Sequence, residues 1–117
     1  MKHVRISDAW TEERGYAREI LLPFEASRDG ATQVQLTRIA PGEMVPVHYH
    51  RRQTEYIFFL EGECRYQFGS GVVNVKAGDL LVIEPMERHS TENSSAVLAL
   101  FLTVKVDDSA GDTVWED

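Results

Sequence analysis

Short apolar segments alternate with turn signals along most of the chain. Residues typical of turns recur at Asp29-Gly30, Pro41-Gly42, Gly69-Ser70-Gly71 and Gly78-Asp79, and the segments between them are rich in Val, Ile, Leu, Phe and Tyr. Many short apolar segments bounded by turn residues predict the strands of a β-sandwich or barrel. The expected strands lie near residues 17–24, 32–40, 45–50, 54–61, 63–68, 72–77, 79–84, 89–94 and 96–106.

Three segments refine this all-β picture. Residues 33–36 alternate polar and apolar side chains, which predicts a half-buried strand. Residues 96–106 are nearly all apolar and predict a strand buried on both faces, one lining the barrel and the other meeting a second sheet or subunit. Residues 8–15 have the composition of one helical turn, and we expect less than about 15% helix in total, well below the usual third.

The chain length of 117 residues suits a single domain with one core. We expect an N-terminal arm and first strand over residues 1–31, a β-barrel domain over residues 32–106 and an acidic tail over residues 107–117. Polar terminal segments fray when nothing holds them, so the tail is expected to fray unless Trp115 docks on the domain.

Charge and apolar content exclude several classes of function. Twelve Lys and Arg against nineteen Asp and Glu give a formal net charge of −7, whereas nucleic-acid binding requires a basic surface. No segment approaches the roughly 18 consecutive apolar residues of a membrane helix. The first residues lack the apolar region of a signal peptide, so we expect a cytoplasmic protein. The sole cysteine, Cys64, cannot form an intramolecular disulfide and is expected to pack within a strand rather than act as a nucleophile.

Three of the four histidines fall where strand geometry can bring them together. His48 and His50 are two residues apart, so a strand directs both imidazoles to one face. Glu55 follows a short polar connection, and a hairpin there would return it to the histidines, while His89 can approach from another strand. Such ligands suit Mn, Fe, Co, Ni, Cu or Zn and leave coordination positions open. Taken alone, His48 and His50 equally fit a surface pair.

These residues stand in an arrangement that resembles the first motif of the cupin superfamily. That motif is Gly, five residues, His-x-His, three or four residues, Glu, six residues and Gly. Every fixed position is matched here, by Gly42, His48, His50, Glu55 and Gly62.

The second cupin motif is matched in part. Gly78, His89 and Asn93 agree with it in identity and spacing. Glu84 stands where the motif has proline and Met86 where it has its second glycine, which leaves the conformation of the loop before His89 open.

The resemblance implies a jelly-roll β-barrel, also called a double-stranded β-helix, with one divalent metal ion on His48, His50, Glu55 and His89. It implies a structural role for Asn93. A metalloenzyme that oxidises, decarboxylates or isomerises a small oxygen-bearing metabolite is the leading hypothesis. A module that binds or senses a small ligand without turnover, and a scaffold with a vestigial site, are the alternatives. No general acid or base identifies itself in the sequence.

The ligand class follows from the charge of the four side chains. Three neutral imidazoles and one carboxylate around a divalent ion leave a formal charge of +1, which favours an anion with two adjacent oxygen atoms as the small-molecule partner. We expect such binding to require the metal. Metal affinity is expected to fall below about pH 6.5, where free imidazole becomes protonated.

Other side chains are assigned by strand parity. Ile57 and Phe59 share a face with Glu55 and are expected to form an apolar wall beside the metal, with Tyr49, Tyr56 and Phe58 facing the other way. The parity of Tyr66 is open, and it is a candidate proton donor in the cavity. Arg38, Arg52 and Arg88 are candidates to bind an anionic substrate at the mouth. A homodimer is expected from apolar outer faces and from an N-terminal segment that contains Trp10, Tyr16, Ile20 and Leu22.

Overall fold

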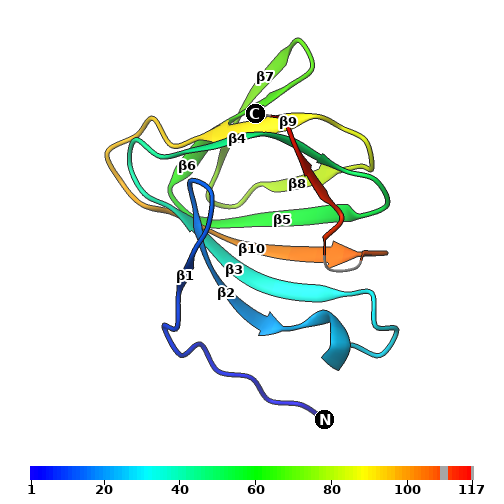
Figure 1. Cartoon of the computed structure of the whole chain (residues 1–117). Coiled ribbons are helices and arrows are strands. Elements are labelled where there is room, and N and C mark those ends of the chain that lie inside the picture. Colours follow the sequence, from blue (N-terminus) through cyan, green and yellow to red (C-terminus); the bar gives the residue numbers. More distant parts are fainter. Residues whose placement is uncertain (109–110, 117) are drawn as a thin grey trace.

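In the computed structural model, two antiparallel sheets face each other and enclose the core between them (Figure 1). The structure describes residues 1–108 and 111–116. One sheet holds, in spatial order, β1 (Thr11–Glu12), β2 (Ala17–Leu22), β3 (Gln33–Ile39), β10 (Ala99–Val106), β5 (Thr54–Glu61) and β8 (Leu80–Ile83). The other holds β11 (Thr113–Trp115), β4 (Met44–His50), β9 (His89–Glu92), β6 (Glu63–Phe68) and β7 (Gly71–Lys76). The predicted all-β class is confirmed.

The described helical structure is one short 3-10 turn, Phe24–Ala26, just after Pro23 ends β2. The prediction of a helical turn within residues 8–15 is wrong. These residues instead begin a tight hairpin, in which β1 pairs with β2 and the Glu13 amide donates to the Tyr16 carbonyl at 2.8 Å. No described helix is long and apolar enough to cross a membrane.

The last long strand, β10, begins at Ala99 and not near residue 96. The Asn93 amide, which is fully buried, donates to the carbonyls of Ile39 and Val97 at 2.8 Å and holds residues 93–98 in a turn. This contact confirms the structural role expected for Asn93. Along β10, buried and half-buried residues alternate: the inner face lines the core as expected, the outer face is half-buried in the single chain, and its contact with a second subunit stays a prediction.

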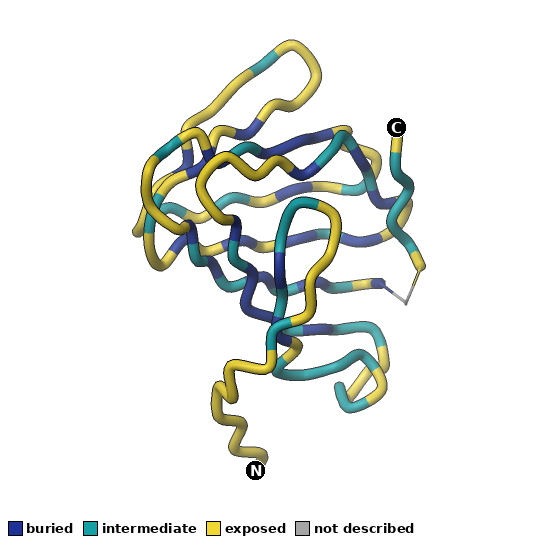
Figure 2. The backbone as a smooth tube through the Cα atoms, turned by 60° about the vertical axis from the view of Figure 1, so that its left-hand side comes forward, coloured by how far each residue is buried: buried dark blue, intermediate teal, exposed yellow. Residues whose placement is uncertain are grey.

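Register across the first sheet stacks the inner side chains in layers. Phe101 lies opposite Phe59, and the two rings stack with centroids 4.6 Å apart. Two residues after Phe101 on β10, Thr103 lies opposite Ile57, which is two residues before Phe59 on β5. Figure 2 shows that the buried residues lie along the facing sheets, while the N-terminal segment and the hairpin that contains β7 are mostly exposed. Cys64 is buried in the same core, as expected, and burial raises the pKa of its thiol to about 11.

Part of the predicted tail docks on the barrel. β11 pairs with β4, with Thr113 opposite His50 and Trp115 opposite His48. Just before the strand, one carboxylate oxygen of Asp112 accepts the backbone N–H groups of Arg52 and Gln53, each at 3.0 Å. Residues 109–110 and 117 of the tail lie outside the described residues, and the division of the chain into arm, domain and tail stays a prediction.

Candidate metal centre

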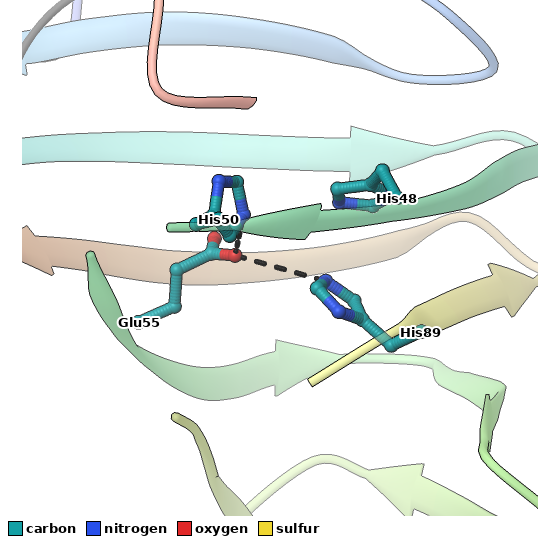
Figure 3. Close-up of side chains that lie close together, drawn as sticks. All are labelled: His48, His50, Glu55 and His89. Carbon is teal, nitrogen blue, oxygen red and sulfur yellow. Dashed lines mark hydrogen bonds and ion pairs between the residues drawn. The ribbon is translucent and has the colours of Figure 1, made fainter. Parts of the chain in front are cut away.

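Four side chains from three strands point toward one another inside the barrel (Figure 3). His48 and His50 come from β4, Glu55 from β5 and His89 from β9. One ligand atom from each residue lies within 4.8 Å of the others, and all four residues are buried. The structure therefore brings together every residue that the two motifs single out as a metal ligand.

The route by which Glu55 arrives differs from the expected hairpin. β4 pairs with β9 and β11, and β5 pairs with β10 and β8, so β4 and β5 belong to different sheets. Residues 51–53 carry the chain across from one sheet to the other. Glu55 consequently meets the histidines across the barrel interior, whereas His89 lies beside His48 as its cross-strand partner.

Two of the imidazoles are fixed as neutral rings with a free nitrogen. His48 Nδ1 lies 2.8 Å from the Pro46 carbonyl oxygen, and His89 Nδ1 lies 2.8 Å from that of Glu87. Because a carbonyl only accepts, each Nδ1 carries the proton and each Nε2 keeps its lone pair. Burial lowers the pKa of His48 to about 4 and also lowers that of His89, which favours the neutral form of both rings.

Glu55 supplies the negative charge of the group. Burial alone would raise its pKa, but a 2.8 Å hydrogen bond from His50, the charge of Lys105 and the nearby histidines together lower the pKa to about 2. Its Oε1 also lies 3.8 Å from His89 Nε2. The carboxylate is therefore ionised throughout the neutral range.

Both ring nitrogens of His50 have a hydrogen-bond partner. Nε2 is hydrogen-bonded to Glu55, and Nδ1 lies 3.2 Å from the hydroxyl of Thr113 on β11. A hydroxyl can donate and accept, so it can serve either tautomer of His50. When Nε2 acts as a ligand, Nδ1 carries the proton and donates to Thr113, which is the usual outer-shell support of a ligating histidine.

The tail contributes a second contact that the sequence did not reveal. Trp115 packs against His48 with ring centroids 4.7 Å apart, and the Arg14 guanidinium lies over the Trp115 ring, 4.7 Å from its centre. The available signal was the spacing of Thr113 and Trp115, two residues apart like His48 and His50. Without knowledge of the pairing partner, that spacing is not specific.

The donor set fits a divalent transition metal. Three imidazoles and one carboxylate are borderline ligands of the kind that Mn, Fe, Co, Ni, Cu and Zn accept, and two of the imidazoles present free Nε2 lone pairs. For His50 to act as a ligand through Nε2, its proton would move to Nδ1, where the Thr113 hydroxyl can accept its hydrogen bond.

A cavity of about 60 Å³ adjoins the four side chains. Ile57 lines it, as expected, but Phe59 does not: that residue is fully buried in the core, deeper along β5. Tyr66 lines the cavity, and burial raises its pKa well above the ordinary value, so its phenol is held protonated. Tyr56 and Phe58 face outward and are 40% and 43% exposed, which confirms their expected direction.

None of the three arginines proposed for the cavity mouth lines the cavity among the described residues. The Arg38 guanidinium stacks over Trp10, 4.3 Å from the ring centre. Arg88 lies over Tyr49, 4.6 Å from its ring centre, and pairs with Glu116. Arg52 is exposed in the connection between β4 and β5. The cation that does line the cavity is Lys105, which sequence reasoning missed.

The loop before His89 is left-handed at Met86, the residue that stands at the position of the second glycine of the motif. Met86 has a φ of 69°, and its backbone N–H donates to the His50 carbonyl at 2.7 Å. Met86 therefore adopts a backbone conformation that glycine reaches more easily. Gly62 illustrates the stricter case, because a Cβ there would lie 2.5 Å from the carbonyl oxygen of Leu98.

Comparison with known proteins identifies the family of this chain. The family model for the cupin domain matches residues 35–105, more than half of the chain. The chain is a cupin. This cupin is 32% identical over 84 residues to the oxalate-binding protein of Thermotoga maritima, covering 72% of this chain and 69% of that protein. It is 33% identical over 87 residues to the tetracenomycin polyketide synthase protein TcmJ of Streptomyces glaucescens, of which it spans 56%.

Solved structures confirm the double-stranded β-helix. The crystal structure of a predicted oxalate decarboxylase from Thermotoga maritima superposes with a TM-score of 0.78 at 30% identity, covering 90% of this cupin and 98% of that chain. A Klebsiella pneumoniae protein with a double-stranded β-helix domain gives a TM-score of 0.74 at 24% identity, covering 97% and 90% of the two chains. The second likeness concerns the fold alone.

Proposed function

We propose that this cupin holds one divalent transition-metal ion on His48, His50, Glu55 and His89 and binds a small oxygen anion there. The observation that carries the proposal is the convergence of four buried donor atoms within 4.8 Å beside a cavity. Buried polar groups of this kind are expensive unless they are paired or coordinate a metal. A bound divalent ion would supply Lewis-acid polarisation of an anion's oxygen atoms.

Two observations support an oxygen anion as the ligand. The metal with its four protein ligands would carry a formal charge of +1 and retain open positions, which suits an anion with two adjacent oxygen atoms. The name of the Thermotoga maritima relative, oxalate-binding protein, describes such an anion. The expectation made from charge alone and the relative's name therefore point to the same class of ligand.

For turnover, we propose that proton transfer would fall to Tyr66. Its hydroxyl is a donor held protonated by burial, and it lines the cavity. Among the described lining residues Glu55 is the sole carboxylate, and as a metal ligand it is not available as a general base. This second observation favours the alternative of a binding module without turnover. Incubating the metal-loaded protein with oxalate and assaying carbon dioxide and formate distinguishes the two.

The metal proposal is tested by elemental analysis of protein purified without a tag or a chelator, followed by calorimetric titration with oxalate. We expect about one metal ion per chain and oxalate binding to the loaded form only. Equal binding to the metal-free form would remove the metal from the function. A triple His48→Ala, His50→Ala, His89→Ala variant that still holds stoichiometric metal would refute the ligand set.

A homodimer is proposed through the outer face of β10, β5 and β8. Register places two apolar rows across these strands, and the most exposed members are 40–61% accessible. The rows are Val104, Tyr56 and Val82, and Leu102, Phe58 and Leu80. Contiguous apolar patches of this kind mark interfaces, and β8 is an edge strand that a second copy can cover.

Light scattering tests the dimer. Phe58→Lys should convert a dimer to a monomer, whereas Val72→Lys, at an exposed apolar position on β7, should not. A wild-type monomer at micromolar concentration would refute the proposal. The cytoplasmic location stays a prediction.

A further inference from the structure

Lys105 is a cation placed inside the barrel. It lies on the inner face of β10, between Gln33 of β3 and Glu55 of β5 in the cross-strand register, and it is 9% exposed. Within residues 1–108 and 111–116 no hydrogen bond or ion pair is formed by its side chain. Its neighbour Glu55 directs Oε1 to His50 instead, at 2.8 Å. A cation that is nine-tenths buried and lines the cavity is placed to meet an anionic ligand there.

The same lysine stands where the cavity meets the exterior. A larger outer hollow of about 380 Å³ lies beside the cavity, and both are lined by Tyr16, Lys105, Thr113 and Trp115. These four residues form the neck between the two spaces. The other cation described in the lining of the outer hollow, Arg18, is paired with Glu13 at 3.1 Å. An anion that passes the neck therefore meets Lys105.

Charge specifies what the cavity accepts. Among the described lining residues Glu55 is the one carboxylate and Lys105 the one ammonium. Together with a divalent ion they give a formal charge of +2, one unit more than the metal and its ligands alone. In a site of low dielectric constant a dianion neutralises this charge, and a monoanion does not.

Size and polarity restrict the dianion further. A volume of about 60 Å³ holds only a few heavy atoms. The wall next to Lys105 is polar and ordered by its own hydrogen bonds: the Gln33 amide donates to Gln35, and the Gln35 amide donates to Thr37, each at 3.1 Å. A fixed amide beside an ammonium suits carboxylate oxygen atoms.

We infer that Lys105 binds the second carboxylate of a very small dicarboxylate whose first oxygen atoms face His48, His50, Glu55 and His89. The inference rests on the proposed function and deepens it: Lys105 makes the site selective for dianions over monoanions of the same size. Lys105 is thereby a specificity-determining residue and has no role in holding the metal.

Calorimetric titration of the manganese-loaded protein with oxalate and with glycolate tests this role. Both offer two adjacent oxygen atoms, but glycolate lacks the second carboxylate. Lys105→Gln should weaken oxalate binding about tenfold to a hundredfold, the value of a hydrogen bond to a charged group, and leave glycolate binding nearly unchanged. Lys105→Arg should retain most of the preference. Lys76→Gln, an exposed lysine on β7, is the matched control.

Elemental analysis of each variant separates the two proposals. Lys105→Gln should hold as much metal as the wild type. If the loaded wild type binds neither anion, the proposed function fails and the inference fails with it. If the wild type binds oxalate and glycolate equally, or if Lys105→Gln keeps the wild-type ratio of the two affinities, the role of Lys105 is refuted and the proposed function survives. The comparison of oxalate with glycolate on the wild-type protein does not depend on the folding of any variant.

Discussion

The inner faces of β5 and β10 change character along their length. At one end of the barrel interior, the apolar end, Phe59 stacks on Phe101 at 4.6 Å and both are buried. At the other, the polar end, Glu55 lies opposite Lys105 beside the histidines. The same two strands thus supply a packed core and a ligand site within four residues. Because burial at the apolar end stabilises the fold, the polar end can hold groups that are unfavourable to bury.

The largest expected effect is the loss of metal binding when the polar end alone is changed. Replacing His50 by Ala should abolish stoichiometric metal binding, because it removes a ligand and leaves the Glu55 carboxylate without its 2.8 Å partner. Circular dichroism should still report the β-rich fold, since the apolar end is untouched. Elemental analysis gives the metal content. A variant that unfolds would show that the two ends are not separable.

Replacing Phe59 by Ala is the reciprocal change at the apolar end. The loss of a fully buried ring that stacks on Phe101 should lower the free energy of unfolding by about 3–5 kcal/mol. Urea denaturation measures this loss. Val72→Ala, at an exposed apolar position on β7, is the control and should cost far less. Protein that remains folded should still take up metal in the same ratio.

Acid should destabilise the polar end first in the metal-free protein. The pKa of His48 is about 4 in the folded chain, against 6.5 for the unfolded one, so between these values the unfolded state binds the extra proton. The free energy of unfolding should therefore fall as the pH is lowered from 6.5 to 4, by about 3 kcal/mol for this group. Denaturation at a series of pH values measures the slope.

The matched variant is His48→Gln, which should lose the part of that slope that His48 contributes. The pKa of Glu55, about 2, adds a separate loss of stability below its ordinary value of 4.5. The lowered pKa of His48 also means that protons compete weakly with a metal for this ring. We therefore expect metal binding to persist to a pH below 6.5. A slope unchanged in His48→Gln would refute the assignment.

Thr113 tests whether the docked tail belongs to the polar end. Thr113→Val keeps the shape of the side chain but removes the hydroxyl that lies 3.2 Å from His50 Nδ1. Loss of such outer-shell support typically reduces metal affinity about tenfold to a hundredfold. Competition with a chromogenic chelator measures it. Thr113→Ser should restore the affinity; if it does not, the contact acts through packing alone.

The convergence of the four candidate ligands at the polar end was predicted correctly from the sequence, whereas the depth of individual side chains along the barrel was not. The spacing of His48 and His50 and the two motifs identified the ligands, because a period of two fixes which face a side chain occupies. Parity does not fix depth, so Phe59 was expected beside the metal although it lies in the core. Lys105 has the inward parity of Phe101, but its neighbours in sequence are apolar, and only the register with Glu55 identifies it.

The pairing of strands was also beyond the sequence. A short connection after His50 suits a hairpin, yet the jelly roll sends the next strand to the opposite sheet, a choice made by contacts far apart in the chain. The docking of Trp115 depended on the same long-range pairing.

The smallest expected effect concerns the loop that carries His89 into the polar end. Met86 adopts a φ of 69°, which an L side chain disfavours and glycine does not, and its side chain is 52% exposed, so little packing is lost on its removal. Met86→Gly should raise the free energy of unfolding by relieving about 1 kcal/mol of backbone strain, offset in part by the greater entropy of an unfolded glycine. Met44→Gly is the control: Met44 is 48% exposed within β4, and glycine weakens a strand. Opposite signs for the two variants in urea denaturation would show that the loop stores strain. A loss of stability in both would mean that the methionine side chain contributes more than its backbone costs.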